Sequence, residues 1–565
     1  MAGFDRAAAL SRLRADQFDL LVIGGGVTGC GVALDAAARG LRTALVDSGD
    51  LGGGTSSKSS KMVHGGLRYL SQRQYRLVAE ALAERQRLLT NACHLVKPLP
   101  FLIPLFTKGQ ERSKSKVKSI AKAYSTALWL YDLGGGLRIG KRHRRISAYG
   151  TQAHLPALRP DVLVDAFLYW DAQTDDARLT LALARTAADH GAAIATYAAV
   201  TSLLEEDGRV SGARLADGTV VRAAAVVNAC GVWSEQVASL SPSPSGHVRL
   251  RPAKGVHLAV PSRRLPCDYA TVLPVPGDRR SVFVVPWDAA GAPGPEGPGR
   301  FTYIGTTDTD YIGPLDEPRV TAEDADYLLG VVNTWTTAEL TPGDITGCWA
   351  GLRPLVAEPG EGAGATTDLS RTHRVHTSPQ GLVTITGGKL TTYRLMAADT
   401  VDTVQRLLGR HLPYCPTRRL PLRGSEGSAE LADPGAAQRL GTTPAVLSHL
   451  AGRYGGEARA VLAMLAADPS LGDAMVEGLP YLRAEALYAA RYEMVQTLSD
   501  VLYRRTRAGI LARDATAAAA PAVAELVGDE LGWDAARKGA EVAAVLAEIK
   551  SERASIAGST VTTGA

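Results

Sequence analysis

The feature that most constrains this chain is a glycine-rich turn between an apolar run and a helical pattern near its start. Gly24, Gly26 and Gly29 follow the apolar run in a G-x-G-x-x-G arrangement. Glycines at these places let the backbone approach a pyrophosphate, whose charge then lies at the N-terminus of the helix. A second apolar run ends in Asp47. An acid about 20 residues beyond the first glycine is placed to bind a ribose hydroxyl, so the sequence predicts a βαβ unit that binds a dinucleotide.

Length and composition fit a multidomain globular protein. The 565 residues are too many for one ordinary core, and 45% of them are apolar while 21% are charged. The net charge of +5 does not by itself indicate a nucleic-acid partner. The six cysteines include no C-x-x-C pair, so no metal site and no redox dithiol are predicted. Their wide spacing is typical of reduced cytosolic thiols, and neither a signal peptide nor a transmembrane run is expected.

Two strand-to-glycine signals far apart in the chain predict a discontinuous nucleotide-binding domain. The second is a strand-like run over residues 383–388, followed by a helical pattern over 390–408. Residues 247–312 are β-rich with Pro and Gly turns, and residues 435–550 have a helical pattern. We therefore expect an α/β Rossmann-like domain with an inserted antiparallel β-rich substrate domain and an appended C-terminal α-helical domain. The expected boundaries are 1–95, 165–246 and 350–411 for the nucleotide-binding domain, 96–164 and 247–349 for the substrate or capping domain, 412–434 for a linker, 435–554 for the helical domain, and 555–565 for a disordered tail.

Two further segments are suited to the rest of a dinucleotide. Small hydroxyl residues and glycines over residues 55–70 can line a pyrophosphate or a flat ring closely, and backbone N–H groups at the start of the helix after Gly388 can stabilise negative charge. A strand that ends near Gly231 is also placed to meet a ligand. The predicted cofactor contacts are Gly24, Gly26, Gly29, Asp47, Thr55, Ser56, Ser60, Gly65, Gly231, Gly388, Leu390 and Thr391.

Several motifs occur together in an order that identifies a family resemblance. They are Ser56–Leu70, Lys254–His257, Ile304–Asp308, Gly351–Leu355 and Gly387–Tyr393. Together they resemble the FAD-dependent (aerobic, respiratory) glycerol-3-phosphate dehydrogenase family, over nearly the whole chain. The segment Leu502–Thr506 also looks like part of the appended domain of that family.

The resemblance implies that the dinucleotide is FAD rather than NAD, in an FAD-binding Rossmann-like domain. It implies oxidation of sn-glycerol 3-phosphate to dihydroxyacetone phosphate, with hydride passing to FAD N5 and electrons then to a membrane quinone. Asp47 would hold the adenosine ribose. The family more often has Glu at this position, and the shorter carboxylate shifts the hydrogen bond without removing its role.

The family motifs also supply the residues for the substrate. A phosphomonoester dianion requires guanidinium and ammonium donors, and Arg68, Arg353, Arg371 and Lys389 are the candidates. Arg371 has the least distinctive surroundings, and a structural salt bridge is the alternative there. Arg353 is also a candidate for binding the substrate hydroxyl or its developing alkoxide, and Tyr69 for orienting the substrate. We group His257, Arg353 and Lys389 as catalytic, and Arg68, Tyr69, His64 and Arg371 as substrate-binding.

A base must take the proton of the hydroxyl that is oxidised. His257 is the first choice, because a neutral imidazole accepts a proton near pH 7, and His64 is the competitor. The sequence alone does not decide between them, since a single histidine is often structural.

A basic stretch over residues 108–131 predicts contact with an anionic membrane surface. Lys114, Lys118 and Lys122 recur at helical spacing, and Val117, Ile120, Tyr124, Leu128 and Tyr131 lie near another face, with Trp129 close by. A basic face beside an apolar, aromatic face suits a peripheral membrane helix, and a solvated charged helix is the alternative. No nucleic-acid motif accompanies it. We expect a cytoplasmic protein on the inner face of the cell membrane, with a homodimer left open.

Other functions remain open at this level. The electron acceptor of a glycerol-3-phosphate oxidase would be O₂, and an FAD-dependent amine oxidase would bind a carboxylate and an amine. A flavin-binding protein without turnover is disfavoured by the intact set Arg68, His257, Arg353 and Lys389. The C-terminal helices carry no chemical motif that reveals their role.

Overall fold

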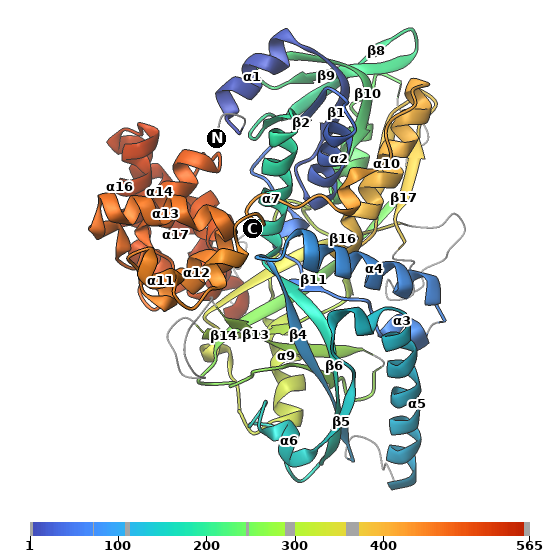
Figure 1. Ribbon diagram of the computed structural model, residues 1–565, viewed down its shortest axis with the longest axis vertical. Coiled ribbons are helices and arrows are strands. Elements are labelled where there is room, and N and C mark those ends of the chain that lie inside the picture. Colours follow the sequence, from blue (N-terminus) through green and yellow to red (C-terminus); the bar gives the residue numbers. More distant parts are fainter. Residues whose placement is uncertain are drawn as a thin grey trace, which may run out of the picture.

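Two β-sheets and a helical domain make up the part of the chain that the structure describes. The computed structural model describes residues 4–71, 73–107, 114–243, 248–278, 280–288, 300–356 and 372–558. In Figure 1 the first sheet lies at the top, the second sheet below it, and the C-terminal helices beside them on the left. This arrangement confirms the predicted fold class.

The first sheet forms around the strand that precedes the glycine turn. Its order in the described residues is β17-β18-β10-β1-β2-β7, with the hairpin β8-β9 attached to β10. Strand β1 pairs in parallel with both β10 and β2. The strands are β1 Gln17–Ile23, β2 Thr43–Val46, β7 Ala193–Ala195, β8 Val200–Glu206, β9 Arg209–Leu215, β10 Val220–Asn228, β17 Arg374–Thr377 and β18 Val383–Thr386.

Helices cover the first sheet and explain why β1 is apolar along most of its length. Leu20 and Val22 join a core with helices α2 (Val27–Ala38), α7 (Asp176–Asp189) and α10 (Tyr393–Leu408). Leu21 and Ile23 point to the other side, into a core shared with helix α1 (Arg6–Ala15) and the β8-β9 hairpin. A strand buried on both faces reads as a continuous hydrophobic run.

The second sheet is mainly antiparallel and is assembled from segments far apart in the sequence. Its order is β15-β11-β14-β13-β12-β4-β6-β3, with β16 on β11 and β5 on β6, within the described residues. Helix α9 (Ala322–Trp335) packs on one face. The strands are β3 Met62–Val63, β4 Val96–Phe106, β5 Arg144–Ser147, β6 Leu163–Thr174, β11 Leu250–Pro261, β12 Ala270–Pro274, β13 Ser281–Asp288, β14 Arg300–Gly305, β15 Thr309–Asp310 and β16 Gly347–Val356.

The long strand β4 is rich in proline. It contains Pro98, Pro100 and Pro104, yet it pairs with β6 along its whole length. The three prolines lie at even-numbered positions, so their missing N–H groups all fall on one edge of the strand. That edge arrangement reconciles a proline-rich sequence with a paired strand.

The domain boundaries drawn from the sequence do not follow the strand pairing at two places. Strand β6 and strand β16 belong to the second sheet, whereas the boundaries assigned residues 165–174 and 350–356 to the nucleotide-binding domain. The reason is that β6 pairs with β4, and β16 pairs with β11 over ten residue pairs. The second sheet therefore includes residues 163–174 and 347–356.

Helices α3 to α8 connect and flank the two sheets. Helix α4 packs beside both the long strand β4 and the segment at residues 390–392. The helices are α3 Arg68–Ser71, α4 Tyr75–Asn91, α5 Lys114–Leu133, α6 Ala148–Gln152 and α8 Ser234–Ala238.

The C-terminal domain is helical, as predicted, and packs against both sheets. Several of its apolar side chains share one core with residues of the second sheet, and α7 of the first domain forms ion pairs with it. The helix α17 continues to Ala557, past the expected boundary at residue 554, and residues 559–565 lie outside the described residues. The helices are α11 Ala436–Arg439, α12 Pro444–Tyr454, α13 Ala458–Ala467, α14 Arg483–Tyr492, α15 Ala508–Leu511, α16 Arg513–Leu531 and α17 Ala535–Ala557, with a π-helical turn at Asp500–Arg505.

Candidate active site

The glycine turn has the close backbone packing that its sequence predicted. It joins β1 to α2, and Gly24 has a φ of 108°, in the region that favours glycine. A Cβ on Gly24 would lie 2.8 Å from the carbonyl oxygen of Ala229, and a Cβ on Gly29 would collide with the carbonyl of Gly24. Side chains are therefore excluded here, and the N-terminus of α2 is open to a close backbone approach.

Asp47 follows β2 directly and lies against the glycine turn. Its Oδ2 accepts a hydrogen bond from the Gly25 N–H at 2.5 Å, and its Oδ1 accepts one from Gly49 at 2.8 Å. Burial raises the pKa of the Asp47 carboxyl, although these two hydrogen bonds oppose the shift. Nearby, Ser56 Oγ accepts the Val27 N–H at 2.9 Å, which connects residues 55–57 to the first turn of α2.

A cavity of about 930 Å³ lies between the two sheets and holds most of the predicted substrate residues. Its size is at the upper end for ligand sites. The predicted residues that line it are Thr55, Ser60, His64, Arg68, Tyr69, His257, Arg353, Gly388, Lys389, Leu390 and Thr391. The remaining predicted glycines, Asp47 and Ser56 are not in its lining. Arg371 lies outside the described residues.

Three predicted substrate residues form a cationic cluster on one wall of the cavity. The Lys389 ammonium lies 3.8 Å from the centre of the Tyr69 ring, and the Arg68 guanidinium lies 5.8 Å from it. Gly66 has a φ of 78°, and a Cβ there would be 2.5 Å from the Tyr69 ring, so a glycine is needed to admit the tyrosine. Cations that flank an aromatic ring in a cavity can bind an anionic group from two sides.

Arg353 comes from β16 and is fixed by three oxygen acceptors of the segment after β14. Its Nη1 donates to Asp308 Oδ1 at 3.1 Å, and its Nη2 donates to Thr306 Oγ1 at 3.1 Å and to the Thr307 carbonyl at 3.2 Å. A Cβ on Gly255, in the neighbouring strand, would be 2.6 Å from Nη2. The three acceptors thus fix the orientation of the guanidinium, and the missing side chain at Gly255 leaves space for it.

His257 comes from β11 and is buried at the cavity wall, with 2% of its surface exposed. Its Nε2 lies 3.0 Å from Ser60 Oγ, and its ring stacks on Trp349 with centroids 4.9 Å apart. Burial, and then the charges of Lys61 and Arg353, hold the pKa of His257 well below its usual 6.5. The imidazole is therefore neutral at pH 7.

The sequence did not predict some residues that hold this geometry in place. Asp308 and Thr306 hold Arg353, and Trp349 stacks on His257 while donating to the Ser59 carbonyl at 3.0 Å. The motif Ile304–Asp308 already contained two of them. Gly65, predicted as a cofactor contact, directs its N–H to Tyr131 and Asp171, at 3.0 and 3.2 Å.

The other end of the cavity is apolar and is formed largely by α5. Ile120, Ala123, Ala127 and Leu130 line it, together with Phe101 of β4. The apolar face of α5 expected to meet a membrane is partly turned inward, because Leu128 and Tyr131 are buried in the core. The exposed apolar residues at this end are Tyr124, Trp129, Leu130, Leu133 and Leu137.

The basic stretch is only partly described. Lys108 and Arg112 lie outside the described residues, and the side chains of Lys114, Lys116 and Lys118 are outside them as well. Lys122 is exposed on α5. Among the helices described, none is long and apolar enough to cross a membrane. The described residues also contain no cluster of His, Cys, Asp or Glu that could hold a metal ion.

Comparisons with known proteins agree with this geometry. The family described as "FAD dependent oxidoreductase" matches residues 19–394, and "C-terminal domain of alpha-glycerophosphate oxidase" matches residues 415–538. The fold and the site therefore define an FAD-dependent oxidoreductase. The cofactor is FAD. The close backbone approach at Gly24 and Gly29 fits the pyrophosphate of that molecule, and the large cavity has room for its ring.

Individual relatives identify the family within this class of oxidoreductases. "Glycerol-3-phosphate dehydrogenase 2" of Mycobacterium bovis is 43% identical over 557 residues, which are 97% of this chain and 90% of that protein. The mitochondrial glycerol-3-phosphate dehydrogenase of Mesocricetus auratus is 38% identical over 95% of this chain and 74% of its own length. The solved glycerol-3-phosphate dehydrogenase of Bacillus halodurans, complexed with FAD, superposes with a TM-score of 0.76 at 30% identity, covering all of both chains. This chain belongs to the FAD-dependent glycerol-3-phosphate dehydrogenase family.

Proposed function

We propose that the chain oxidises sn-glycerol 3-phosphate to dihydroxyacetone phosphate and passes the electrons to a membrane quinone. The observation that carries the proposal is the cavity itself, where a buried neutral imidazole, a fixed guanidinium and a cationic cluster meet. An alcohol that carries a phosphate dianion matches this set of groups.

The phosphate is assigned to the cluster of Arg68, Tyr69 and Lys389. Two cations and a phenol supply donors for a dianion, and Arg280 also lines the cavity. Arg353 is assigned to the hydroxyl that is oxidised, because its guanidinium is fixed by Asp308 and Thr306 and would stabilise a developing alkoxide. Arg371 remains a predicted contact.

His257 is assigned as the base. Its lowered pKa keeps the imidazole unprotonated and ready to accept a proton. Nδ1 is buried and has no hydrogen-bond partner among the described residues, so we assign the proton to Nε2, which faces Ser60 of the cavity lining. Ser60 holds the ring through Nε2. His64 also lines the cavity and remains the competitor.

FAD is assigned to the predicted contacts from Gly24 to Thr391. The adenosine ribose would meet Asp47, the pyrophosphate would lie over Gly24, Gly26 and Gly29, and the ring would reach the cavity beside Gly388 and Thr391. When bound, the flavin supplies the acceptor for the hydride of the substrate. The chain supplies position, charge and a proton acceptor.

The apolar end of the cavity supports a quinone as the acceptor. A wall of Ile120, Ala127 and Leu130 offers carbon surface to a flat apolar ring, and Leu130 is also exposed at the outer surface of α5. The exposed residues Trp129 and Leu133 with Lys122 support contact with an anionic membrane at this end. A cytoplasmic location at the inner membrane face and a homodimer stay predictions.

Anaerobic reduction tests the proposal. The purified holoenzyme is mixed with sn-glycerol 3-phosphate without oxygen, and the visible absorbance of the flavin is followed. We expect rapid bleaching with this substrate and none with glycerol, which lacks the phosphate. Failure to bleach would reject the proposed reaction.

The reduced enzyme then separates the acceptors. Fast reoxidation by a soluble quinone with slow reoxidation by O₂ is expected for a dehydrogenase. The opposite order would identify an oxidase, and reduction by an amino acid instead of glycerol 3-phosphate would identify an amine oxidase.

A further inference from the structure

One segment of the C-terminal domain reaches both loops that form the cofactor side of the site. It runs from Arg504 to Arg507 and begins with the last two residues of the π-helical turn Asp500–Arg505. The first loop runs from Asp47 to Gly53, and the second covers residues 57–61. Neither of these loops belongs to the C-terminal domain, so the contacts join distant parts of the chain.

The contact with the first loop is a buried cluster of charges. Arg505 donates to both carboxylate oxygens of Asp50, at 2.6 and 2.8 Å, and Arg504 Nε donates to Oδ2 at 2.5 Å. Burial alone would raise the pKa of Asp50, but Arg505 and Arg504 hold it below its usual range. The same loop donates the Gly52 N–H to the Gly25 carbonyl at 2.9 Å, so it borders the glycine turn.

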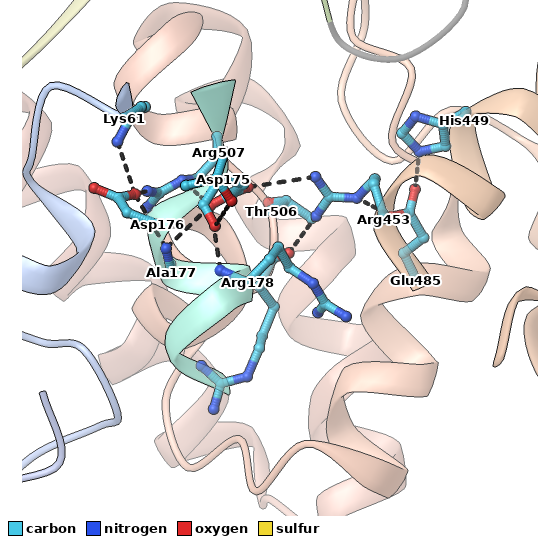
Figure 2. A network of polar contacts seen from close by, with 12 residues as sticks. Lys61, Asp175, Asp176, Ala177, Arg178, His449, Arg453, Glu485, Thr506 and Arg507 are labelled. Atoms are coloured by element: carbon cyan, nitrogen blue, oxygen red, sulfur yellow. Dashed lines mark hydrogen bonds and ion pairs between the residues drawn. The ribbon is translucent and has the colours of Figure 1, made fainter. Parts of the chain in front are cut away.

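The contact with the second loop is made by Arg507, shown with its partners in Figure 2. Arg507 is 1% exposed, and its Nη2 donates to Asp176 Oδ1 and, at 3.0 Å, to the Ser57 carbonyl. Its Nε lies 3.2 Å from Asp175 Oδ1. A planar guanidinium can satisfy several acceptors at fixed angles, which an ammonium cannot do.

Asp176 passes this constraint to the loop. Its Oδ2 accepts the N–H of Ser59 at 2.9 Å and the Ser59 hydroxyl at 2.6 Å, and its Oδ1 accepts Lys61 Nζ at 3.0 Å. Ser60 lies between these two fixed residues, and its Oγ is the partner of His257 Nε2. A chain of direct contacts therefore runs from Arg507 through Asp176 to the ring assigned as the base.

We propose that Arg507 is a positioning residue, through which the C-terminal domain fixes the loop 57–61 and hence the hydrogen bond between Ser60 and His257. Arg504 and Arg505 hold the loop 47–53 in the same way through Asp50. The kinetic part of this proposal rests on the proposed oxidation, whereas its structural part does not. The helical domain is then a support of the active site rather than a separate module.

The alternative is that Arg507 only adds stability, as any buried ion pair does when breaking it leaves a charge unpaired. The chain offers a matched control in Arg185 of α7. Arg185 is 3% exposed and donates to both carboxylate oxygens of Glu457, at 2.7 and 3.0 Å, so it also connects the first domain to the C-terminal domain. Within the described part of the chain, Arg185 makes no hydrogen bond or ion pair with residues 57–61.

The test compares full-length holoenzymes carrying Arg507→Met, Arg507→Lys, Arg185→Met and Arg185→Lys. Hydrogen exchange of the peptide that contains Ser59 and Lys61 is measured first, because both amides are hydrogen-bonded within this network. We expect exchange at least about 10-fold faster in Arg507→Met, a smaller increase in Arg507→Lys, and no change at these amides in either Arg185 variant. The melting temperature should fall in both methionine variants.

Kinetics supply the second readout. A displacement of about 1 Å at a reacting group lowers rates by about 100-fold, so Arg507→Met should lower kcat by about that factor with little change in KM, and Arg507→Lys should recover part of it.

The pH dependence of the rate, through Lys61, is a third readout. Lys61 faces Asp175, Asp176, Arg507 and His257, and burial and then Arg507 lower its pKa to about 8. Removing the Arg507 charge should raise that pKa and move any alkaline loss of activity to higher pH.

Each outcome decides the matter. Equal losses of melting temperature in Arg507→Met and Arg185→Met, with unchanged amide exchange at residues 59–61 and unchanged kcat, would overturn the proposal. If Arg507→Met does not fold, the same comparison is made between Arg507→Lys and Arg185→Lys. If glycerol 3-phosphate fails to reduce the wild-type flavin, the proposed function is wrong, and amide exchange alone still decides the positioning role.

Discussion

At one end of the cavity, side-chain hydrogen bonds hold His257 and Arg353 in place. At the other end, α5 presents the side chains of Ile120, Ala127 and Leu130, which offer only carbon atoms. The polar end is assembled from both sheets, and its groups can move little without losing a partner. The apolar end is the surface of one helix beside β4. Hydrogen bonds fix direction, while apolar packing fixes only proximity.

This difference matches the two half-reactions that we propose. Removing a hydride and a proton from one carbon requires groups aligned to a fraction of an ångström. Electrons can pass to an acceptor that only needs to lie near the flavin. Changes at the polar end should therefore alter the reduction of the flavin, and changes at the apolar end should alter its reoxidation.

The largest effect is expected at Arg353. Replacing Arg353 by Met removes the guanidinium and leaves Asp308 with one fewer cation, so negative charge would face the substrate. We expect flavin reduction by glycerol 3-phosphate to slow about 1000-fold, the upper end for loss of one group that stabilises an oxyanion. Stopped-flow absorbance under anaerobic conditions measures the rate.

Arg353→Lys is the matched control. It keeps a positive charge but cannot reach Asp308 and Thr306 together, so a smaller loss is expected. FAD content should be unchanged in both variants, because the residue is assigned to substrate. A normal reduction rate in Arg353→Met would show that the hydroxyl is bound elsewhere.

His257 is expected to have the next largest effect. His257→Gln should lower the reduction rate by about 100-fold or more, the usual contribution of a positioned base. Since burial, Lys61 and Arg353 hold the pKa of His257 below 6.5, the ring is neutral at pH 6.5 and is protonated only at lower pH. The rate should thus stay on its plateau at pH 6.5 and fall as the pH is lowered further.

The competing histidine gives the control. His64→Gln should cost less and keep the acid limb of the wild-type pH profile. A larger loss in His64→Gln than in His257→Gln, with the acid limb abolished in the former, would transfer the role of base to His64.

The sequence predicted the fold well where the signals were local. The turn Gly24–Gly29, Asp47 after β2, and the helix that follows Gly388 each follow from residues close together in the chain. The long strand β4 was not predicted, because its three prolines suggest irregular structure when its partner strand β6 is not known. Strand pairing over large separations is what short-range patterns do not contain.

The candidate site shows the same limit. The family resemblance predicted that His257, Arg353 and Lys389 belong to one site, and all three line the same cavity. The link from Arg507 to Ser57 spans 450 positions, and nothing near either residue indicates the other. Likewise α5 showed amphipathic spacing, but the burial of Leu128 and Tyr131 depends on the sheet against which the helix packs.

A smaller effect is expected at the apolar end. Leu130 lines the cavity, so Leu130→Asn should raise the KM for a soluble quinone by about 10-fold. This factor corresponds to about 1.4 kcal/mol, which is within the range for burying an apolar side chain. The rate of flavin bleaching by glycerol 3-phosphate should stay the same.

Leu133 is a matched control on the same helix. It is 71% exposed and is not part of the cavity lining, so Leu133→Asn should leave the quinone KM unchanged. If Leu130→Asn and Leu133→Asn behave alike, or if Leu130→Asn slows bleaching instead, the division of the cavity into two functional ends is wrong.

The smallest effect concerns the outer surface of α5. Lys122 is exposed beside the apolar end, and a basic residue near an anionic bilayer contributes about 1 kcal/mol, or about 5-fold in binding. Lys122→Ala should therefore weaken sedimentation with anionic vesicles by about that factor at low salt, while Lys122→Arg should bind as the wild type does. At 1 M salt the difference should vanish, because charges are screened beyond about 3 Å.

Leu133→Asn should weaken vesicle binding at both salt concentrations, since the contribution of Leu133 is apolar. Unchanged binding in Lys122→Ala and Leu133→Asn at low salt would mean that this face of α5 does not meet the membrane, and the route of electrons from the apolar end would then have to be sought on another surface.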